Sequence, residues 1–525
     1  MTAYDKLGTQ MQGVSTIVAV PQWYLQNNLD LLVKNGETTA GKKIKDVYLT
    51  DPTDGNLWLS GVLSALKVHV YVPGAPTRMK FILQFASGTM QYVDEGGIAP
   101  KQLECKIDGL VFGFDVNLSY QDVEDNPDLP PDVRAAVSSL LQYKDGGAFT
   151  IQHLFMELEN AAVEQYDPAL TVWSPDMPQA ARDQFPRYLG SYLTALTQVG
   201  GNTLGYAIAV DTTADSPATF PATSLRYQTN QYQNGAAGDA TLDCVLYLMM
   251  TDGEDFPKTF QPWWGDLTVP DDRTTGWNGT MAVAERKFVP GFLLPSIAPL
   301  LTSFWKLRDG SGLDAVYDLS SGSFTPTALG GHFDSGQQTG ISRQNNPVSV
   351  DTAKYLMQVV ADVGVSPGKN LIVITRTTTF QIDFTHWYGF ENASAKSEYR
   401  VKYVIPVTYV ITLSGAMDGT LQVGVDVETK PRPTNVLSSD PYFWYITESE
   451  GSTSIWSTVS DRMTDEIDRM AALALSAAIP PGLTDALKQQ LNLNPFVFPG
   501  SGQLFLGNLL FDYAGDLLVG LQYKS

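Results

Sequence analysis

The sequence is short of cysteine, of charge and above all of basic residues. Cys105 and Cys244 are the two cysteines among 525 residues, which leaves no disulfide framework and no Cys-x-x-Cys zinc site. Charged residues make up 17% of the chain, against about a quarter in an average globular protein. There are 34 Lys and Arg against 56 Asp and Glu, a net charge of −22. With no basic run, we expect no nucleic-acid partner, and electrostatic docking on an anionic membrane is disfavoured.

Long hydrophobic runs and leader-like segments are missing as well. No stretch approaches the roughly 18 consecutive apolar residues of a transmembrane helix. The N-terminal residues lack a basic region followed by an apolar one. We therefore expect a soluble protein, cytoplasmic or exported without a conventional signal peptide, whose contact with a membrane is at most peripheral.

Motifs of nucleotide and acyl chemistry are absent too. The sequence has no Gly-x-x-x-x-Gly-Lys-Ser/Thr loop, no Gly-x-Gly-x-x-Gly fingerprint and no Gly-x-Ser-x-Gly elbow. His332 lies two residues from Asp334, and His386 lies three residues from Asp383, but neither pair has a third ligand or a nucleophile nearby. We predict that the protein is not an enzyme and has no catalytic residue, no metal site and no cofactor.

What the sequence does contain is alternation of apolar and polar residues, the mark of half-buried strands. The alternating runs are 67–72, 79–85, 110–120, 399–413 and 421–427. The run 399–413 is more than twice the usual strand length and would span about 50 Å. Pro406 within it predicts a bulge or an edge position, because proline has no N–H for the ladder. A turn over 415–419 joins this run to the next one and predicts a hairpin.

Helical patterns are fewer than strand patterns and would cover the apolar faces of the strands. They occur at 131–141, 179–199, 461–478 and 484–491. Pro186 inside the second of these predicts a kink or a restart. Residues 242–250 are apolar nearly all round, which fits either a buried helix or a buried strand. We predict an elongated, mostly β, α+β fold in which long curved antiparallel sheets wrap around amphipathic helices.

The domain organisation is only weakly marked. A stretch rich in Gly, Ser, Gln and Asn near 330–347 is the best boundary. It predicts an N-terminal portion of hairpins and a helix over 1–335 and a C-terminal portion of the same kind over 345–525. Because both portions carry long hairpins, they could also be interleaved into one elongated unit.

An apolar segment broken by three prolines is the best candidate for a binding surface. It runs from Phe288 to Trp305, and its prolines exclude a simple helix. Such a segment either packs in the core or lines a cavity for an apolar ligand. The candidate lining residues are Phe292, Leu293, Leu294, Leu301, Phe304 and Trp305.

Two alternatives use other features. In the first, the protein is a structural or interaction protein whose groove is filled by its own core. In the second, Trp263 and Trp264 stack on a sugar beside Asp266, as in a carbohydrate-binding or carbohydrate-active protein. The acidic run Asp252-Gly-Glu-Asp255 has a faint likeness to a calcium loop but lacks its full ligand pattern.

The C-terminal sequence carries a family resemblance. Phe496-Val-Phe-Pro-Gly-Ser-Gly, Phe505 and Phe511-Asp-Tyr-Ala-Gly-Asp-Leu, together with Phe220-Pro-Ala-Thr-Ser-Leu, resemble segments of the forty-seven-kilodalton accessory proteins encoded beside clostridial neurotoxins. Those proteins belong to the tubular lipid-binding (TULIP) superfamily. The resemblance implies a long curved sheet around a helix, a groove for a lipid and no catalytic residues. It also implies a role as an accessory protein of a toxin or secretion locus. The present chain is longer, and its residues 252–280 do not match.

Overall fold

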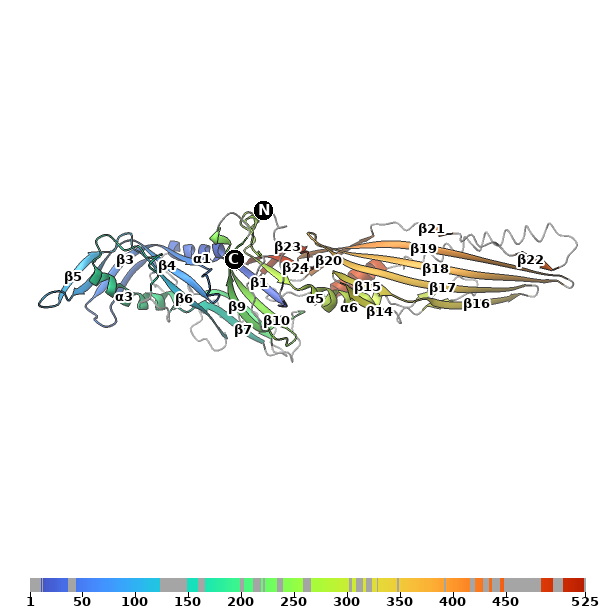
Figure 1. The fold of residues 1–525 in the computed structure, drawn as a ribbon, viewed down its shortest axis with the longest axis horizontal. Coiled ribbons are helices and arrows are strands. Elements are labelled where there is room, and N and C mark those ends of the chain that lie inside the picture. The colour runs from blue at the N-terminus through green and yellow to red at the C-terminus, as the bar shows by residue number, and fades with distance from the viewer. Residues whose placement is uncertain are drawn as a thin grey trace.

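The structure is a computed structural model. The residues that it describes are 11, 13–35, 44–122, 149–158, 166–198, 203–210, 219–220, 222–233, 239–257, 266–301, 305–307, 315–317, 323–327, 329–346, 349–390, 393–415, 421–427, 434–436, 444–447, 483–493 and 504–523. The molecule is elongated and has two halves, each built on its own large sheet, that meet near the middle (Figure 1). No helix in the described part of the chain is long and apolar enough to cross a membrane.

The N-terminal half is built on a 13-stranded sheet. Its strands are β1 (Thr16–Pro21), β2 (Asp46–Thr50), β3 (Trp58–His69), β4 (Arg78–Asp94), β5 (Lys101–Lys106), β6 (Val111–Asp122), β7 (Phe149–Met156), β8 (Thr203–Val210), β9 (Ala222–Asn230), β10 (Cys244–Thr251), β11 (Gly279–Val283), β23 (Leu504–Phe511) and β24 (Leu517–Tyr523). They are ordered β2-β3-β4-β6-β7-β8-β9-β10-β1-β11-β24-β23, with β5 paired to β4. The last two strands of the chain thus return to the sheet that the first strands form.

Among the described residues, four helical elements accompany this sheet, and one of them, α3, was predicted from apolar periodicity. They are α1 (Gln22–Asn35), α3 (Gln179–Gln198), the 3-10 turn η5 (Ala240–Leu242) and α4 (Asp271–Thr275). In α3 the predicted apolar face is buried, and Phe185 packs on Phe85 and Phe112 with ring centroids 6.0 Å and 5.1 Å away. The helix does not restart at Pro186 but runs through it as one element. Residues 242–250, for which both a helix and a strand fitted, are strand from Cys244 on, as part of β10, and Leu242 is the last residue of η5.

The C-terminal half is built on a nine-stranded sheet. Its strands are β14 (Ser323–Thr327), β15 (Gly330–Asp334), β16 (Gln338–Asn346), β17 (Ser349–Ser366), β18 (Leu371–Phe390), β19 (Ala393–Gly415), β20 (Leu421–Val427), β21 (Thr434–Val436) and β22 (Trp444–Thr447). A separate pair consists of β12 (Trp305–Leu307) and β13 (Ala315–Tyr317). The helical elements are α5 (Glu285–Lys287), the π-helix η6 (Phe288–Leu293), α6 (Leu294–Leu301) and α8 (Leu483–Leu493).

The long strands are the main feature of this half, and they confirm the prediction of an elongated, mostly β fold. β17, β18 and β19 have 18, 20 and 23 residues, three to four times the usual length of about five or six. β19 contains the predicted run 399–413 and forms the predicted hairpin with β20. Pro406 pairs with Thr377 of β18, whereas no described strand pairs with residues 405–408 on the other side of β19. Among the described strands the proline thus has a neighbour on one side only, which fits the predicted edge position.

The helices predicted at 131–141 and 461–478 lie outside the described residues. The helix predicted at 484–491 is α8, which packs against β20 and α6. Figure 1 shows α5 and α6 at the end of the long strands that faces the N-terminal half. This placement puts the proline-rich apolar segment between the two sheets.

Candidate functional site

The candidate site is built around the crossover segment, residues 285–301, which leads from β11 of the first sheet toward the second sheet. It is helical throughout, but it changes from α5 to the π-helix η6 and back to α6. The backbone N–H of Leu294 donates to the carbonyl oxygen of Val289, five residues earlier. The wider π turn accommodates the ring of Pro290, which would clash in a regular α-helix. The prolines thus prevent a simple helix, as predicted, without preventing a helix altogether.

Most of the apolar side chains of the crossover segment are buried. They are Phe288, Val289, Phe292, Leu293, Leu294 and Ile297. They belong to one apolar cluster with residues of both sheets: Met281 and Val283 of β11, Phe511 of β23, Leu517 of β24, Phe333 of β15, Val359 of β17, Ile374 of β18 and Val407 of β19. The ring of Phe288 lies 5.8 Å from that of Phe511 and 5.8 Å from that of Phe292, centroid to centroid.

Three of the six predicted lining residues meet in this cluster. Phe292, Leu293 and Leu294 are 8%, 1% and 5% exposed. Leu301 is the last residue of α6. Trp305 lies in β12, where it pairs with Tyr317 of β13. Phe304 lies outside the described residues.

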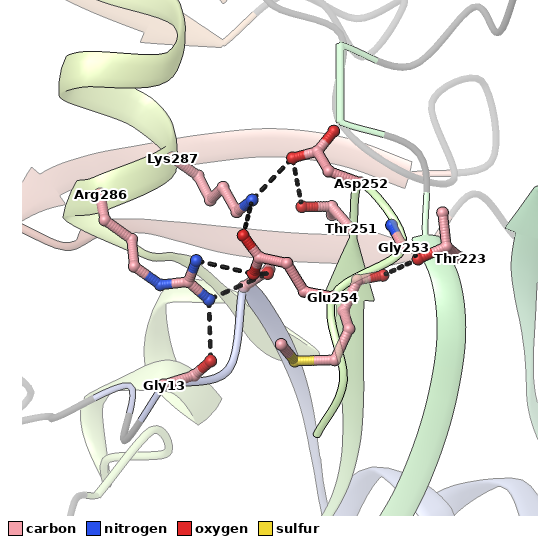
Figure 2. A network of polar contacts seen from close by, with 10 residues as sticks. Gly13, Thr223, Thr251, Asp252, Gly253, Glu254, Arg286 and Lys287 are labelled. Atoms are coloured by element: carbon pink, nitrogen blue, oxygen red, sulfur yellow. Dashed lines mark hydrogen bonds and ion pairs between the residues drawn. The ribbon is translucent and has the colours of Figure 1, made fainter. Parts of the chain in front are cut away.

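A network of ion pairs holds the start of the crossover segment to the first sheet (Figure 2). The Lys287 ammonium lies 2.6 Å from Asp252 Oδ2 and 2.7 Å from Glu254 Oε1. The Arg286 guanidinium lies 2.8 Å from Glu254 Oε2 and donates to the carbonyl oxygen of Gly13 at 2.8 Å. Burial alone would raise the pKa of Glu254, but its hydrogen bonds to Lys287 and Arg286 hold that pKa below its usual value. The network ties three segments that are far apart in the sequence.

The same geometry explains the acidic run at 252–255. Asp252 and Gly253 have φ values of 59° and 71°, and the N–H of Glu254 donates to the carbonyl oxygen of Thr251 at 3.0 Å. This is the tight turn that an Asp-Gly pair favours. Its Asp and Glu carboxylates contact Lys287 and Arg286, and in the described part of the chain no group of three His, Cys, Asp or Glu is placed to hold a metal. The structure gives the likeness to a calcium loop no support.

A cluster of three carboxyl groups lies beside this network. The N–H of Glu285 donates to Asp516 Oδ1 at 2.7 Å, and the N–H groups of Ala514 and Asp516 donate to Asp512 Oδ1 at 2.8 Å and 2.9 Å. Burial, with the charge of Asp516, raises the pKa of Glu285 and of Asp512 to about 7. Burial also raises the pKa of Asp516 to about 6, against the lowering effect of its backbone hydrogen bonds.

These raised pKa values predict a pH effect on stability. The unfolded chain releases the Asp512 proton near pH 4, whereas the folded protein keeps it until about pH 7. The stability that this proton provides is therefore complete below about pH 4 and is lost as the pH rises to about 7. We expect Asp512→Asn to become more stable relative to wild type between pH 5 and pH 8, as measured by urea unfolding. Glu285→Gln should change in the same direction, and a difference that does not depend on pH would contradict the assignment.

Other residues singled out in the sequence have structural partners. Nδ1 of His332 lies 2.7 Å from Oδ1 of Asp362, on the neighbouring strand, and Asp334 instead accepts from Gln358 Nε2 at 2.9 Å. Asp266 is 5% exposed and accepts from the N–H of Gln233 at 2.9 Å. Trp263 and Trp264 lie outside the described residues. His332 and Asp334 thus have separate hydrogen-bond partners, and the two tryptophans expected beside Asp266 are not among the residues that the structure describes.

The sequence did not point to two buried cations, Lys287 of α5 and Arg376 of β18, which are 7% and 1% exposed. Arg376 lies deep in the second sheet. It shares its face of the strand with Ile372, Ile374, Thr378 and Phe380, all of which are buried. In the sequence, residue 376 is an even number of positions from the apolar residues 372, 374 and 380, which places it on the same face of a strand. The alternation did not show which face is buried, because Leu371 and Val373 make the opposite face apolar as well.

No protein-family model and no curated protein sequence matches the chain. Among solved structures it aligns with P47 of Clostridium botulinum E1, at 8% identity and a TM-score of 0.44, over 98% of this chain and 100% of that chain. It aligns with P47 from Clostridium botulinum A2 at 9% identity and a TM-score of 0.45, over 99% and 100% of the two chains. It also aligns with lipopolysaccharide binding protein at 10% identity and a TM-score of 0.29, over 98% and 99%.

Proposed function

We propose that this protein binds a lipid or another apolar ligand, without catalysis, between the long sheet of its C-terminal half and the crossover segment. Phe292, Leu293 and Leu294 would line the site, and Leu301, Phe304 and Trp305 would extend it. A role as an accessory protein of a toxin or secretion locus is part of the proposal and comes from the sequence resemblance alone.

The observation that carries the proposal is the apolar face of the long strands. On one face of β17, β18 and β19, every second residue is apolar and buried along much of the strands. These residues are Met357, Val359, Ala361, Val363, Ile372, Ile374, Phe380, Ile405, Val407 and Ile411. They share one cluster with the helical segments that pack on them. At about 0.8 kcal/mol for each buried CH₂, a sixteen-carbon chain would gain roughly 10 kcal/mol here before ordering costs.

Uptake of a fatty acid tests the proposal. The full chain, freed of lipid by organic extraction, should gain the mass of a bound palmitate in native mass spectrometry. A photoactivatable palmitate should label peptides from 285–301 and 371–380, and excess palmitate should suppress the labelling. Labelling confined to the N-terminal half would contradict the location.

A pair of leucine variants sharpens this test. Leu293 of η6 and Leu193 of α3 are both helical and both 1% exposed, but they lie in different halves. A tryptophan at either position overpacks a core by a similar amount. We expect Leu293→Trp to weaken palmitate binding by about tenfold or more, and Leu193→Trp to leave it within about twofold.

Two outcomes would favour the alternatives. A clean mass with no uptake would favour a structural protein with a closed core. Binding on a glycan array that is abolished by the double variant Trp263→Ala, Trp264→Ala would favour a carbohydrate ligand.

A further inference from the structure

A buried cation lies within the apolar face of the long sheet. Arg376 lies on the face of β18 that contributes Ile372, Ile374 and Phe380 to the apolar cluster. It is the one buried charged side chain among those residues of β17, β18 and β19 whose burial the structure describes. Burial lowers the pKa of Arg376 to about 10, against an opposing effect of Tyr409, so the guanidinium stays charged at neutral pH. A charge in such surroundings costs free energy unless acceptors compensate it.

The strand register shows what surrounds this guanidinium. Arg376 pairs with Ala361 of β17 on one side and with Val407 of β19 on the other. The residues next along the same face of β18, Ile374 and Thr378, pair with Tyr409 and Ile405 of β19. Neighbours on one face of a strand are about 7 Å apart, and diagonal pairs across strands are within reach of long side chains. Ala361, the partner of Arg376 on β17, has a small apolar side chain.

Two hydroxyl groups next to Arg376 are buried without a hydrogen-bond partner. They are Thr378 Oγ1 and the Tyr409 hydroxyl oxygen, on residues that are both 0% exposed. Unsatisfied buried hydroxyls are costly, and each one calls for an explanation such as a missing ligand. Arg376 also interacts with other parts of the chain, but a guanidinium has five N–H donors and can serve several acceptors at once.

We propose that Arg376, Thr378 and Tyr409 form a binding site for an oxyanion, the carboxylate or phosphate of an amphiphilic ligand whose apolar chain lies along the sheet. The guanidinium would donate two parallel N–H hydrogen bonds to the oxyanion, and the two hydroxyls would donate to the remaining lone pairs of its oxygens. This inference rests on the proposed function and adds the class of head group and its place. The anionic end would be held inside the C-terminal half rather than at its surface.

Ligands that differ only in the head group test the proposal. Palmitate and hexadecanol share the alkyl chain, and 1-palmitoyl lysophosphatidic acid and monopalmitoylglycerol form the matching pair for phosphate. Dissociation constants would be measured on the full delipidated chain. We expect wild type to bind the anion of each pair at least about tenfold more tightly, because hydrogen bonds to charged groups are strong. The pair with the larger ratio identifies a carboxylate or a phosphate as the preferred group.

The variants assign the preference to these residues. Arg376→Gln should reduce the anion preference by about tenfold or more and leave hexadecanol binding within about twofold. Arg78→Gln, which changes an exposed arginine of β4, should leave the preference unchanged. Tyr409→Phe and Thr378→Val remove one hydroxyl each and should each reduce it by about threefold or more. These two variants still test the site if Arg376→Gln does not fold.

The failures of the two proposals are distinguishable. If wild type binds the anionic and the neutral ligand equally well in both pairs, the oxyanion site is wrong and the apolar binding function stands. If the anion preference is unchanged in Arg376→Gln, Tyr409→Phe and Thr378→Val, the preference arises elsewhere and the site is also wrong. If no ligand of either pair binds, the proposed function fails and the oxyanion site fails with it.

Discussion

Truncation of Phe288 to alanine is expected to lower the free energy of unfolding by about 3–5 kcal/mol, the range for a large buried aromatic side chain. Phe288 is 0% exposed and begins the π-helix η6. Its ring packs on Phe511 of β23 and on Phe292. Removing it leaves a cavity at the point where the crossover segment, the first sheet and the second sheet meet. Urea unfolding followed by circular dichroism would measure the loss.

Tyr513→Ala is the matched control for this substitution. Tyr513 lies two residues after Phe511 in the turn between β23 and β24, but it is 69% exposed. Its truncation should change the free energy of unfolding by about 0.5 kcal/mol or less. Similar losses for the two variants would show that Phe288 does not hold the two halves together.

Two glycines that face each other across β15 and β17 are expected to respond in opposite ways to the same substitution. Gly330 of β15 pairs with Gly364 of β17 and also with Thr327 of β14. A Cβ at Gly330 would overlap the carbonyl oxygen of Val363 and would lie 2.9 Å from the Cα of Gly364. Because Gly330 pairs with β14 on one side and with β17 on the other, β15 cannot move away from Val363 without breaking backbone hydrogen bonds between these strands. Gly330→Ala should therefore cost about 3 kcal/mol, the upper part of the usual range for overpacking.

Gly364→Ala should be tolerated. A Cβ at Gly364 meets only the carbonyl oxygen of Leu329, at 4.0 Å, which is ordinary contact. Alanine also reduces the freedom of the unfolded chain, so the expected change in stability lies within about 1 kcal/mol and is stabilising if the strand does not move. Thermal unfolding of both variants is sufficient. Equal melting temperatures would show that β15 and β17 do not approach each other as closely as described.

Much of the secondary structure could be predicted because periodicity is a local property. The runs 79–85, 110–120, 399–413 and 421–427 correspond to β4, β6, β19 and β20, whereas the run 67–72 overlaps only the last three residues of β3. The apolar spacing of 179–199 corresponds to α3 and its buried face. The length of the run 399–413 also predicted the elongated shape. Each of these features depends on the residues of one segment and on the geometry of one element.

The candidate site was less predictable because its contacts join distant parts of the chain. The apolar character of Phe292, Leu293 and Leu294 predicted burial, but not the elements that bury them. Lys287 contacts Asp252 and Glu254, 35 and 33 residues earlier in the chain. No local pattern pairs these charges, and the acidic run could therefore be interpreted as a calcium loop.

The sequence by itself thus determined the kind of element where its periodicity is long, as in α3 and β19, and the elongated β-rich architecture. Only the tertiary structure decided which strands are neighbours, as with β23 and β24, which join the first sheet at β11. It also decided which face of β18 is buried and so enclosed Arg376. The physical reason is that both faces of residues 371–374 are apolar, and the choice between them depends on the register with β17 and β19 and on the segments that pack against the sheet.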